Sequence, residues 1–135
     1  MFQKRKLLIF AAAALILFSP ACSFSSKQAN IKDAVLTVDP EVGQPTNVFT
    51  PDQTFYLIVE LDDAPDDTLL KSTWVAVRVE DVEPEFVIDE AQITTGLPIV
   101  TFDLGNEYLW PTGAYRVDLY LNGELDLSLD FVVRE

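Results

Sequence analysis

The sequence predicts an all-β fold, a two-layer sandwich of six or seven antiparallel strands, and three observations support it. After residue 30, apolar side chains recur mostly at every second position, which is the period of a β-strand. These segments follow one another at intervals of roughly 12 to 20 residues, with turn residues between them. The third observation is a hairpin near the C-terminus with one apolar face, which a second sheet must cover.

The first two expected strands lie at 34–38 and 54–61. The first, from Ala34 to Val38, would be an edge strand because it ends at Pro40. In the second strand, apolar side chains occupy one face: Phe55, Leu57, Val59 and Leu61. Their neighbours in the sequence would face the other way.

Three more strands are expected in the middle of the chain. The segment 73–80 carries Trp74 and three valines, and we expect Trp74 in the core. Acidic residues interrupt the segment 86–93, where a short edge strand is favoured over a loop. The segment 97–104 brings Val100, Phe102 and Leu104 to one side.

The last third of the chain predicts a β-hairpin. In 115–121 the odd positions are apolar or aromatic, while Arg116, Asp118 and Tyr120 face the other way. Asn122 and Gly123 tolerate the positive φ angles of a two-residue type I′ turn. The alternation resumes over 125–131, so we expect two paired strands with one apolar and one polar face.

The segment Trp110-Pro111-Thr112-Gly113-Ala114-Tyr115 resembles the tyrosine corner of immunoglobulin-like and fibronectin-type domains. This resemblance implies that Gly113 permits a tight turn and that the Tyr115 hydroxyl bonds to a main-chain group. More broadly, about 100 residues resemble the small immunoglobulin-like domains of bacterial envelope proteins. The resemblance implies an immunoglobulin-like β-sandwich over 31–135, without the paired cysteines of antibody domains. It implies no activity, because such sandwiches host many functions.

The N-terminus has the layout of a bacterial secretion signal, which we place at residues 1–21. Three basic residues at 4–6 precede an apolar run from Leu7 to Phe18. That run has about 12 residues, whereas a membrane-spanning helix needs roughly 20. We therefore exclude residues 1–21 from the fold.

The segment from Ser19 to Cys22 resembles the lipobox of bacterial lipoproteins, which implies a lipid on Cys22, the only cysteine. Ala21 fits that pattern, whereas Ser19 and Pro20 depart from it. The spacing of Ser19 and Ala21 also suits ordinary signal peptidase, which would release a soluble secreted protein. Under the lipoprotein interpretation, 22–30 comprise the lipidated cysteine and a flexible tether to the domain at 31–135.

The composition excludes several classes of function. Without residues 1–21 the chain has 22 acidic and six basic residues, so it would repel nucleic acids. It contains no histidine, the usual general base and the commonest zinc ligand. Carboxylate pairs can cleave glycosides, but a small two-layer sandwich rarely encloses the cleft they need. We therefore predict no enzymatic activity and no catalytic residues.

Two features are candidate ligand sites. Carboxylates suit calcium, and four of them surround a proline after an expected strand: Asp62, Asp63, Asp66 and Asp67. The alternative is a solvated loop, and the same choice applies to the acidic residues at 80–85. Trp110 could be a stacking platform for a carbohydrate, or it could cap the end of the sandwich.

These observations favour a non-catalytic, immunoglobulin-like module, lipid-anchored on the extracytoplasmic side of the cell envelope. It would act through protein–protein contacts, as an accessory subunit or a structural lipoprotein, using a sheet edge or its acidic face. The alternative is an extracytoplasmic module that binds carbohydrate or calcium. No other cofactor is expected.

Overall fold

The computed structural model describes residues 29–135, which form eight strands in two sheets. The strands are β1 (Asn30–Thr37), β2 (Val48–Phe49), β3 (Phe55–Asp62), β4 (Leu69–Val79), β5 (Phe86–Thr94), β6 (Ile99–Leu104), β7 (Gly113–Leu121) and β8 (Glu124–Val133). The predictions for the signal peptide, for Cys22 and for residues 23–28 of the tether lie outside the described residues. Within residues 29–135, no helix is long and apolar enough to cross a membrane.

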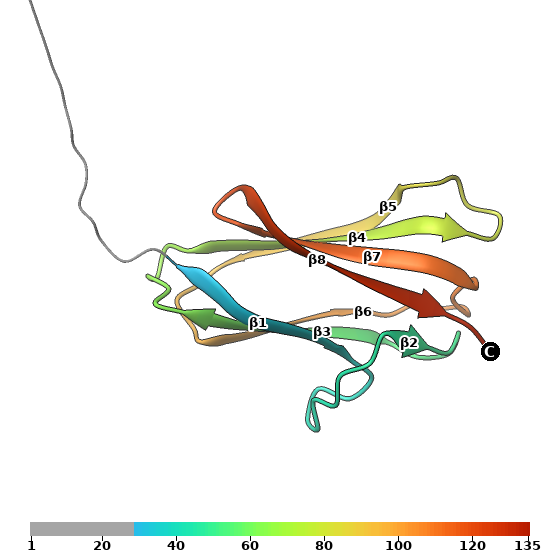
Figure 1. Ribbon diagram of the computed structural model, residues 1–135, viewed down its shortest axis with the longest axis horizontal. Coiled ribbons are helices and arrows are strands. Elements are labelled where there is room, and N and C mark those ends of the chain that lie inside the picture. Colours follow the sequence, from blue (N-terminus) through green and yellow to red (C-terminus); the bar gives the residue numbers. More distant parts are fainter. Residues whose placement is uncertain (1–28) are drawn as a thin grey trace, which may run out of the picture.

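The two sheets form a sandwich with Greek-key connections. The first sheet has the order β1-β3-β6, and the second has the order β2-β8-β7-β4-β5. Neighbouring strands are antiparallel except for β2, which pairs with β8 in parallel. Figure 1 shows the two layers, with the start of β1 at one end and the C-terminus at the other. The all-β sandwich predicted from the sequence is confirmed.

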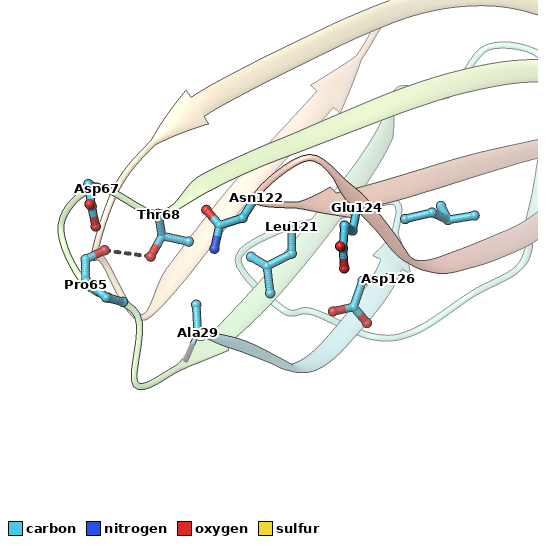
Figure 2. A pocket seen from close by; sticks show the side chains of 9 residues that line it. Ala29, Pro65, Asp67, Thr68, Leu121, Asn122, Glu124 and Asp126 are labelled. Carbon is cyan, nitrogen blue, oxygen red and sulfur yellow. Dashed lines mark hydrogen bonds between the residues drawn. The ribbon is translucent and has the colours of Figure 1, made fainter. Parts of the chain in front are cut away.

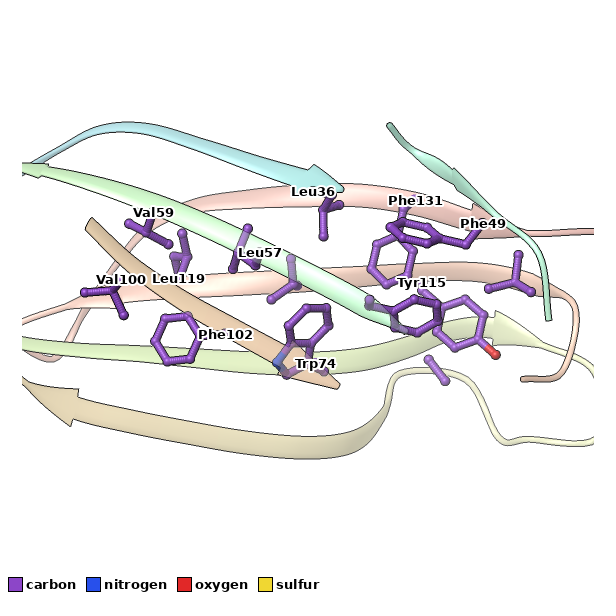
Figure 3. Close-up of a cluster of buried hydrophobic side chains, with 14 of the residues drawn as sticks. Leu36, Phe49, Leu57, Val59, Trp74, Val100, Phe102, Tyr115, Leu119 and Phe131 are labelled. Carbon is purple, nitrogen blue, oxygen red and sulfur yellow. The ribbon is translucent and has the colours of Figure 1, made fainter. Parts of the chain in front are cut away.

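The core lies between the sheets and is organised around Phe55, which is fully buried (Figure 3 shows part of this cluster). Its ring stacks on Trp110 at a centroid distance of 4.6 Å and packs edge-on against Phe131 at 4.8 Å. Trp74 is 1 % exposed, as predicted, and its Nε1 donates a hydrogen bond to Ser72 Oγ at 3.2 Å. Aromatic pairs of this kind add roughly 0.5–1.5 kcal/mol each to the burial of apolar area.

The turn into β7 is a tyrosine corner, as the resemblance implies. The Tyr115 hydroxyl donates a hydrogen bond of 2.6 Å to the carbonyl oxygen of Pro111. Gly113 has a φ of 150°, and a Cβ at this position would lie 2.5 Å from the carbonyl oxygen of Arg78. Only glycine therefore allows this turn to approach β4 so closely.

The hairpin of β7 and β8 is confirmed, with one difference. Asn122 and Gly123 have φ values of 52° and 88°, as a type I′ turn requires. The register between β7 and β8 shifts at Asp126, which forms a bulge. Because the bulge inserts one residue, Leu125 leaves the apolar face and is 57 % exposed.

Several strands differ in extent from the sequence-based expectation. The strand expected at 34–38 begins at Asn30, and the one at 73–80 begins at Leu69. The segment 86–93, which acidic residues interrupt, belongs to the nine-residue strand β5. The sequence pattern missed β2, because two residues show no alternation. Phe49 of β2 is nevertheless fully buried in the core. The described residues thus form eight strands rather than six or seven.

Candidate functional site

The predicted acidic residues lie on the loop between β3 and β4 and at its entrance. Asp62 is the last residue of β3, and Asp63, Asp66 and Asp67 follow it, all exposed. The loop closes where the backbone nitrogen and the hydroxyl of Thr68 both donate to the Pro65 carbonyl, at 3.0 and 2.7 Å. The four carboxylates therefore extend from a compact turn at one end of the sandwich.

The structure does not gather these carboxylates into a cation site. No group of three or more acidic or cysteine side chains within residues 29–135 is arranged to hold a metal ion. The second acidic segment, 80–85, follows the other end of β4, which has 11 residues and is roughly 35 Å long. The two acidic segments therefore lie at opposite ends of the sandwich. A calcium site at the four aspartates stays a prediction.

One of the four aspartates does line a groove. Asp67 lies at one end of an open hollow of about 670 Å³, and Glu124 and Asp126 of β8 lie at the other end (Figure 2). Between them lie Leu121 and Asn122. Such a volume falls within the roughly 300–1,000 Å³ of ligand sites. The carboxylates would favour a cationic ligand. They do not converge on one point, because Asp67 lies alone at one end and Glu124 and Asp126 lie together at the other.

The groove joins segments that are far apart in the sequence. The backbone nitrogen of Leu69 donates to Asn122 Oδ1 at 2.9 Å, and the nitrogen of Asn122 donates to the Leu69 carbonyl at 2.7 Å. These bonds hold the acidic loop against the turn between β7 and β8. Sequence reasoning missed Glu124 and Asp126 as groove residues because no local pattern shows this contact.

Trp110 lies at the end of the sandwich and is 7 % exposed. Its Nε1 donates to the Gln53 carbonyl at 3.0 Å, and its backbone nitrogen donates to the Pro51 carbonyl at 2.8 Å. The hollow that it lines with Phe86 and other residues measures about 110 Å³, well below the volume of usual ligand sites. Trp110 as a carbohydrate platform stays a prediction, and its position is that of a cap on the core.

A charged network lies on the outer face of the second sheet, and the sequence did not predict that one of its members is buried. Asp118 is 7 % exposed because Arg116 and Ser128 cover it. Arg116 Nε donates to Asp118 Oδ1 at 2.8 Å, and Arg116 also pairs with Glu85 at 3.0 Å. The hydrogen bonds to Glu85 and then to Asp118 raise the pKa of the Arg116 guanidinium further above its usual value. Every member has a partner, so the network is a stabilising one.

Comparison with solved structures identifies the architecture. An immunoglobulin-like protein from Pseudomonas aeruginosa aligns with a TM-score of 0.55 at 16 % identity, covering 80 % of this chain and 98 % of that one. The fold is immunoglobulin-like. This level of identity shows only the fold, and the immunoglobulin-like domain hosts many unrelated activities.

Parts of two larger proteins align with the same immunoglobulin-like domain. A β-glucosidase from Listeria innocua in complex with glucose has a TM-score of 0.51 at 12 % identity, covering 88 % of this chain but 17 % of that one. An alkylpurine DNA glycosylase from Pseudomonas fluorescens has a TM-score of 0.50 at 14 % identity, covering 79 % and 30 %. The chain thus spans a minor part of both enzymes. No family model and no curated protein matches the chain.

Proposed function

We propose that this chain is a non-catalytic, envelope-anchored immunoglobulin-like module that acts through protein–protein contacts. It would be an accessory subunit of a membrane assembly or a structural lipoprotein. The observation that carries the proposal is the distribution of exposed apolar side chains. Among the described residues, seven of the twelve large exposed ones fall within 86–109: Phe86, Val87, Ile93, Leu97, Ile99, Tyr108 and Leu109. These side chains lie on β5, on β6 and in the two loops that adjoin β6, and exposed apolar side chains on neighbouring elements favour contact with a protein partner.

The position of the chain entry supports the same proposal. The domain begins at Asn30, eight residues after Cys22, so an extended tether could span at most about 28 Å. A lipid on Cys22 would therefore hold the groove end of the sandwich near the membrane. Tyr108 and Leu109, in the loop after β6, would then face away from it, where an envelope partner can reach them.

The test is crosslinking in intact membranes, followed by capture through a C-terminal tag and mass spectrometry. We expect a stoichiometric protein partner and a lipid-modified peptide that begins at Cys22. A lipidated chain with no partner at stoichiometric yield would contradict a function through protein contacts. It would favour the alternative of an extracytoplasmic module that binds carbohydrate or calcium.

The groove is the observation that favours this alternative. Its volume of about 670 Å³ and its three carboxylates, Asp67, Glu124 and Asp126, suit a small cationic ligand better than the cavity beside Trp110 suits a sugar. Binding there would stabilise the folded chain in proportion to ligand concentration, which a thermal melt measures directly.

A further inference from the structure

Strand β6 is an edge of the three-stranded sheet, and its register shows which backbone groups face outward. Leu61 donates to the Pro98 carbonyl at 2.7 Å, one position beyond the pair of Glu60 and Ile99, so this is a hydrogen-bonding position of the ladder, where proline can only accept. In an antiparallel ladder such positions alternate with non-bonded ones. Val100, Phe102 and Leu104 therefore bond toward β3. The backbone N–H and C=O groups of the intervening residues point away from it, at 99, 101 and 103.

No described strand covers these outward groups, because β6 pairs only with β3 within residues 29–135. The free edge thus presents three N–H donors and three C=O acceptors in a row. The six pairs between β3 and β6 run without a register shift, so this row is regular. A regular, uncovered edge is a template for another strand.

The other edges of the two sheets are interrupted. β1 has a bulge at Lys32, and the nitrogen of Thr46 donates to the outward carbonyl of Leu36 at 2.8 Å. β8 has the bulge at Asp126, and β2 pairs with its last residues. β5 has a bulge at Ile88. Bulges and covering segments are the usual protection of sheet edges, and among the described strands β6 has neither.

The side chains also distinguish β6 from β5. Beyond its bulge, β5 directs the backbone of three polar residues outward: Glu90, Gln92 and Thr94. On β6, Ile99 is 57 % exposed on the outer face, and Leu97 just before the strand is 60 % exposed. At the other end of the strand, Asp103 is exposed. A strand added to β6 would therefore gain apolar contacts at one end and meet a carboxylate at the other.

The charge of the domain determines the kind of partner. Residues 29–135 contain 22 acidic residues and five basic ones: Lys32, Lys71, Arg78, Arg116 and Arg134. Two copies of such a domain repel each other, whereas a basic segment is attracted. Antiparallel pairing of two β6 strands about Thr101 would also place the carboxylate of Asp103 opposite the apolar side chain of Ile99, which is an unfavourable cross-strand pair.

We propose that the edge of β6 binds an extended basic segment of a partner protein as an added strand, with apolar residues opposite Ile99 and a lysine or arginine opposite Asp103. This inference rests on the proposed function and names its contact surface. Main-chain hydrogen bonds supply affinity in this mode of recognition, and the side chains supply the choice of partner.

The experiment measures amide hydrogen exchange in the full chain in detergent, with a seven-residue basic peptide as the probe, in which a lysine and a valine stand four positions apart so that they can lie opposite Asp103 and Ile99 on the same face. We expect the amides of Ile99, Thr101 and Asp103 to exchange at least about tenfold more slowly when the peptide is bound. A peptide with glutamate in place of lysine should give no protection. The proposal fails if the lysine peptide protects Glu90, Gln92 and Thr94 instead, or protects neither edge at millimolar concentration.

Thr101→Pro removes one outward N–H without breaking a bond to β3, because proline is tolerated at such edge positions. We expect it to weaken peptide binding at least tenfold. Gln92→Pro is the matched control, because its N–H also points outward, from β5, and binding should not change. Unaltered exchange at Val100 and Phe102 verifies that the sheet is intact. Equal binding by both variants would overturn the assignment of the edge.

A second pair of variants tests the charge without altering the backbone. Asp103→Lys should weaken binding of the lysine peptide by several-fold, whereas Asp130→Lys, which makes the same charge change on β8, should have less effect. Equal effects would contradict the predicted contact at Asp103.

A peptide-free dimer that Thr101→Pro dissociates would assign the edge to a second copy and overturn the proposal. If Thr101→Pro captures the membrane partner as well as the unmodified chain, the proposed function stands and the edge assignment is wrong.

Discussion

Tyr115 connects the core to the turn that begins β7. Its ring stacks on Phe131 at a centroid distance of 5.4 Å, while its hydroxyl reaches the Pro111 carbonyl. Only 2 % of the residue is exposed, and burial raises the pKa of Tyr115 to about 12. The folded chain therefore keeps this phenol protonated at pH values where an unfolded chain would release the proton.

This difference predicts a loss of stability in alkali. An unfolded tyrosine titrates near pH 10, so between about pH 10 and 12 the folded state binds more protons and the free energy of unfolding falls as pH rises. Below about pH 10 the contribution of this group is constant. Urea unfolding across this range should show the decline, by about 1.4 kcal/mol per pH unit at most.

Tyr115→Phe serves as the control for that decline. It loses the hydrogen bond, which costs about 1 kcal/mol below about pH 10, and it removes the part of the alkaline slope due to this phenol, so the difference between the two chains shrinks as the pH rises. An identical slope in the variant and in the unmodified chain would show that other groups cause the decline.

Asp118 and Glu85 both pair with Arg116, but they differ in exposure. The side chain of Asp118 is 10 % exposed, and that of Glu85 is 56 % exposed. Asp118→Ala should lower the free energy of unfolding by about 2–3 kcal/mol, because it leaves Arg116 and Ser128 without their buried acceptor. Glu85→Ala should cost less than about 1 kcal/mol. Urea denaturation compares the two, and equal losses would show that burial does not govern this network.

At the scale of the elements, Gly113 brings the β7 turn close to the backbone of β4. A Cβ on Gly113 would lie 2.7 Å from the Cα of Val79, in addition to its clash with the Arg78 carbonyl. At Gly123, the turn between β7 and β8, no atom lies within 4 Å of such a Cβ. Both residues have positive φ, so the two sites differ mainly in packing.

Gly113→Ala should therefore destabilise the domain by more than about 3 kcal/mol, whereas Gly123→Ala should cost about 1 kcal/mol for backbone strain alone. Thermal unfolding followed by circular dichroism measures both. Comparable melting temperatures for the two variants would indicate that the corner can move away from β4.

The acidic loop between β3 and β4 gives a prediction about calcium. Because its carboxylates do not converge, we expect the melting temperature of the domain to be the same with and without millimolar calcium. Replacing Asp62, Asp63, Asp66 and Asp67 together by asparagine should then leave the calcium response unchanged. A rise in melting temperature that this replacement abolishes would favour the ligand-binding alternative.

At the scale of the whole molecule, the two ends of the sandwich have different surroundings if Cys22 carries a lipid. The groove with its carboxylates lies at the end where the described chain enters, and the loop with Tyr108 and Leu109 follows β6 at the other end. An anionic membrane would repel the acidic end. The tether would thus hold the domain beside the bilayer without docking it there.

The anchor itself is testable by fractionation. Cys22→Ser should remove the site of lipid attachment and, where the signal is still cleaved, move the chain from the membrane fraction to the soluble fraction. Ser23→Ala, the neighbouring substitution, should leave the chain in the membrane fraction. A soluble unmodified chain would favour cleavage by ordinary signal peptidase.

Features that depend on neighbouring residues could be predicted from the sequence. The alternation in β7 and β8, the Asn122-Gly123 turn and the tyrosine corner at Tyr115 each involve short segments, and the structure confirms all three. The burial of Trp74 followed from its place among valines. The absence of histidine and the excess of carboxylates likewise follow from composition alone.

The tertiary structure alone decided which segments meet. Two features depend on pairing between distant parts of the chain: the burial of Phe49 in β2 and the approach of Asp67 to the groove that Asp126 also lines. The uncovered edge of β6 depends on such pairing as well. The bulge that turns Leu125 outward depends on the register that β8 adopts against β7. Local alternation indicates which face of a strand is apolar, but it contains no information on the neighbour that each edge receives. That choice is made by packing across the whole core, and it determines the surface offered to a partner.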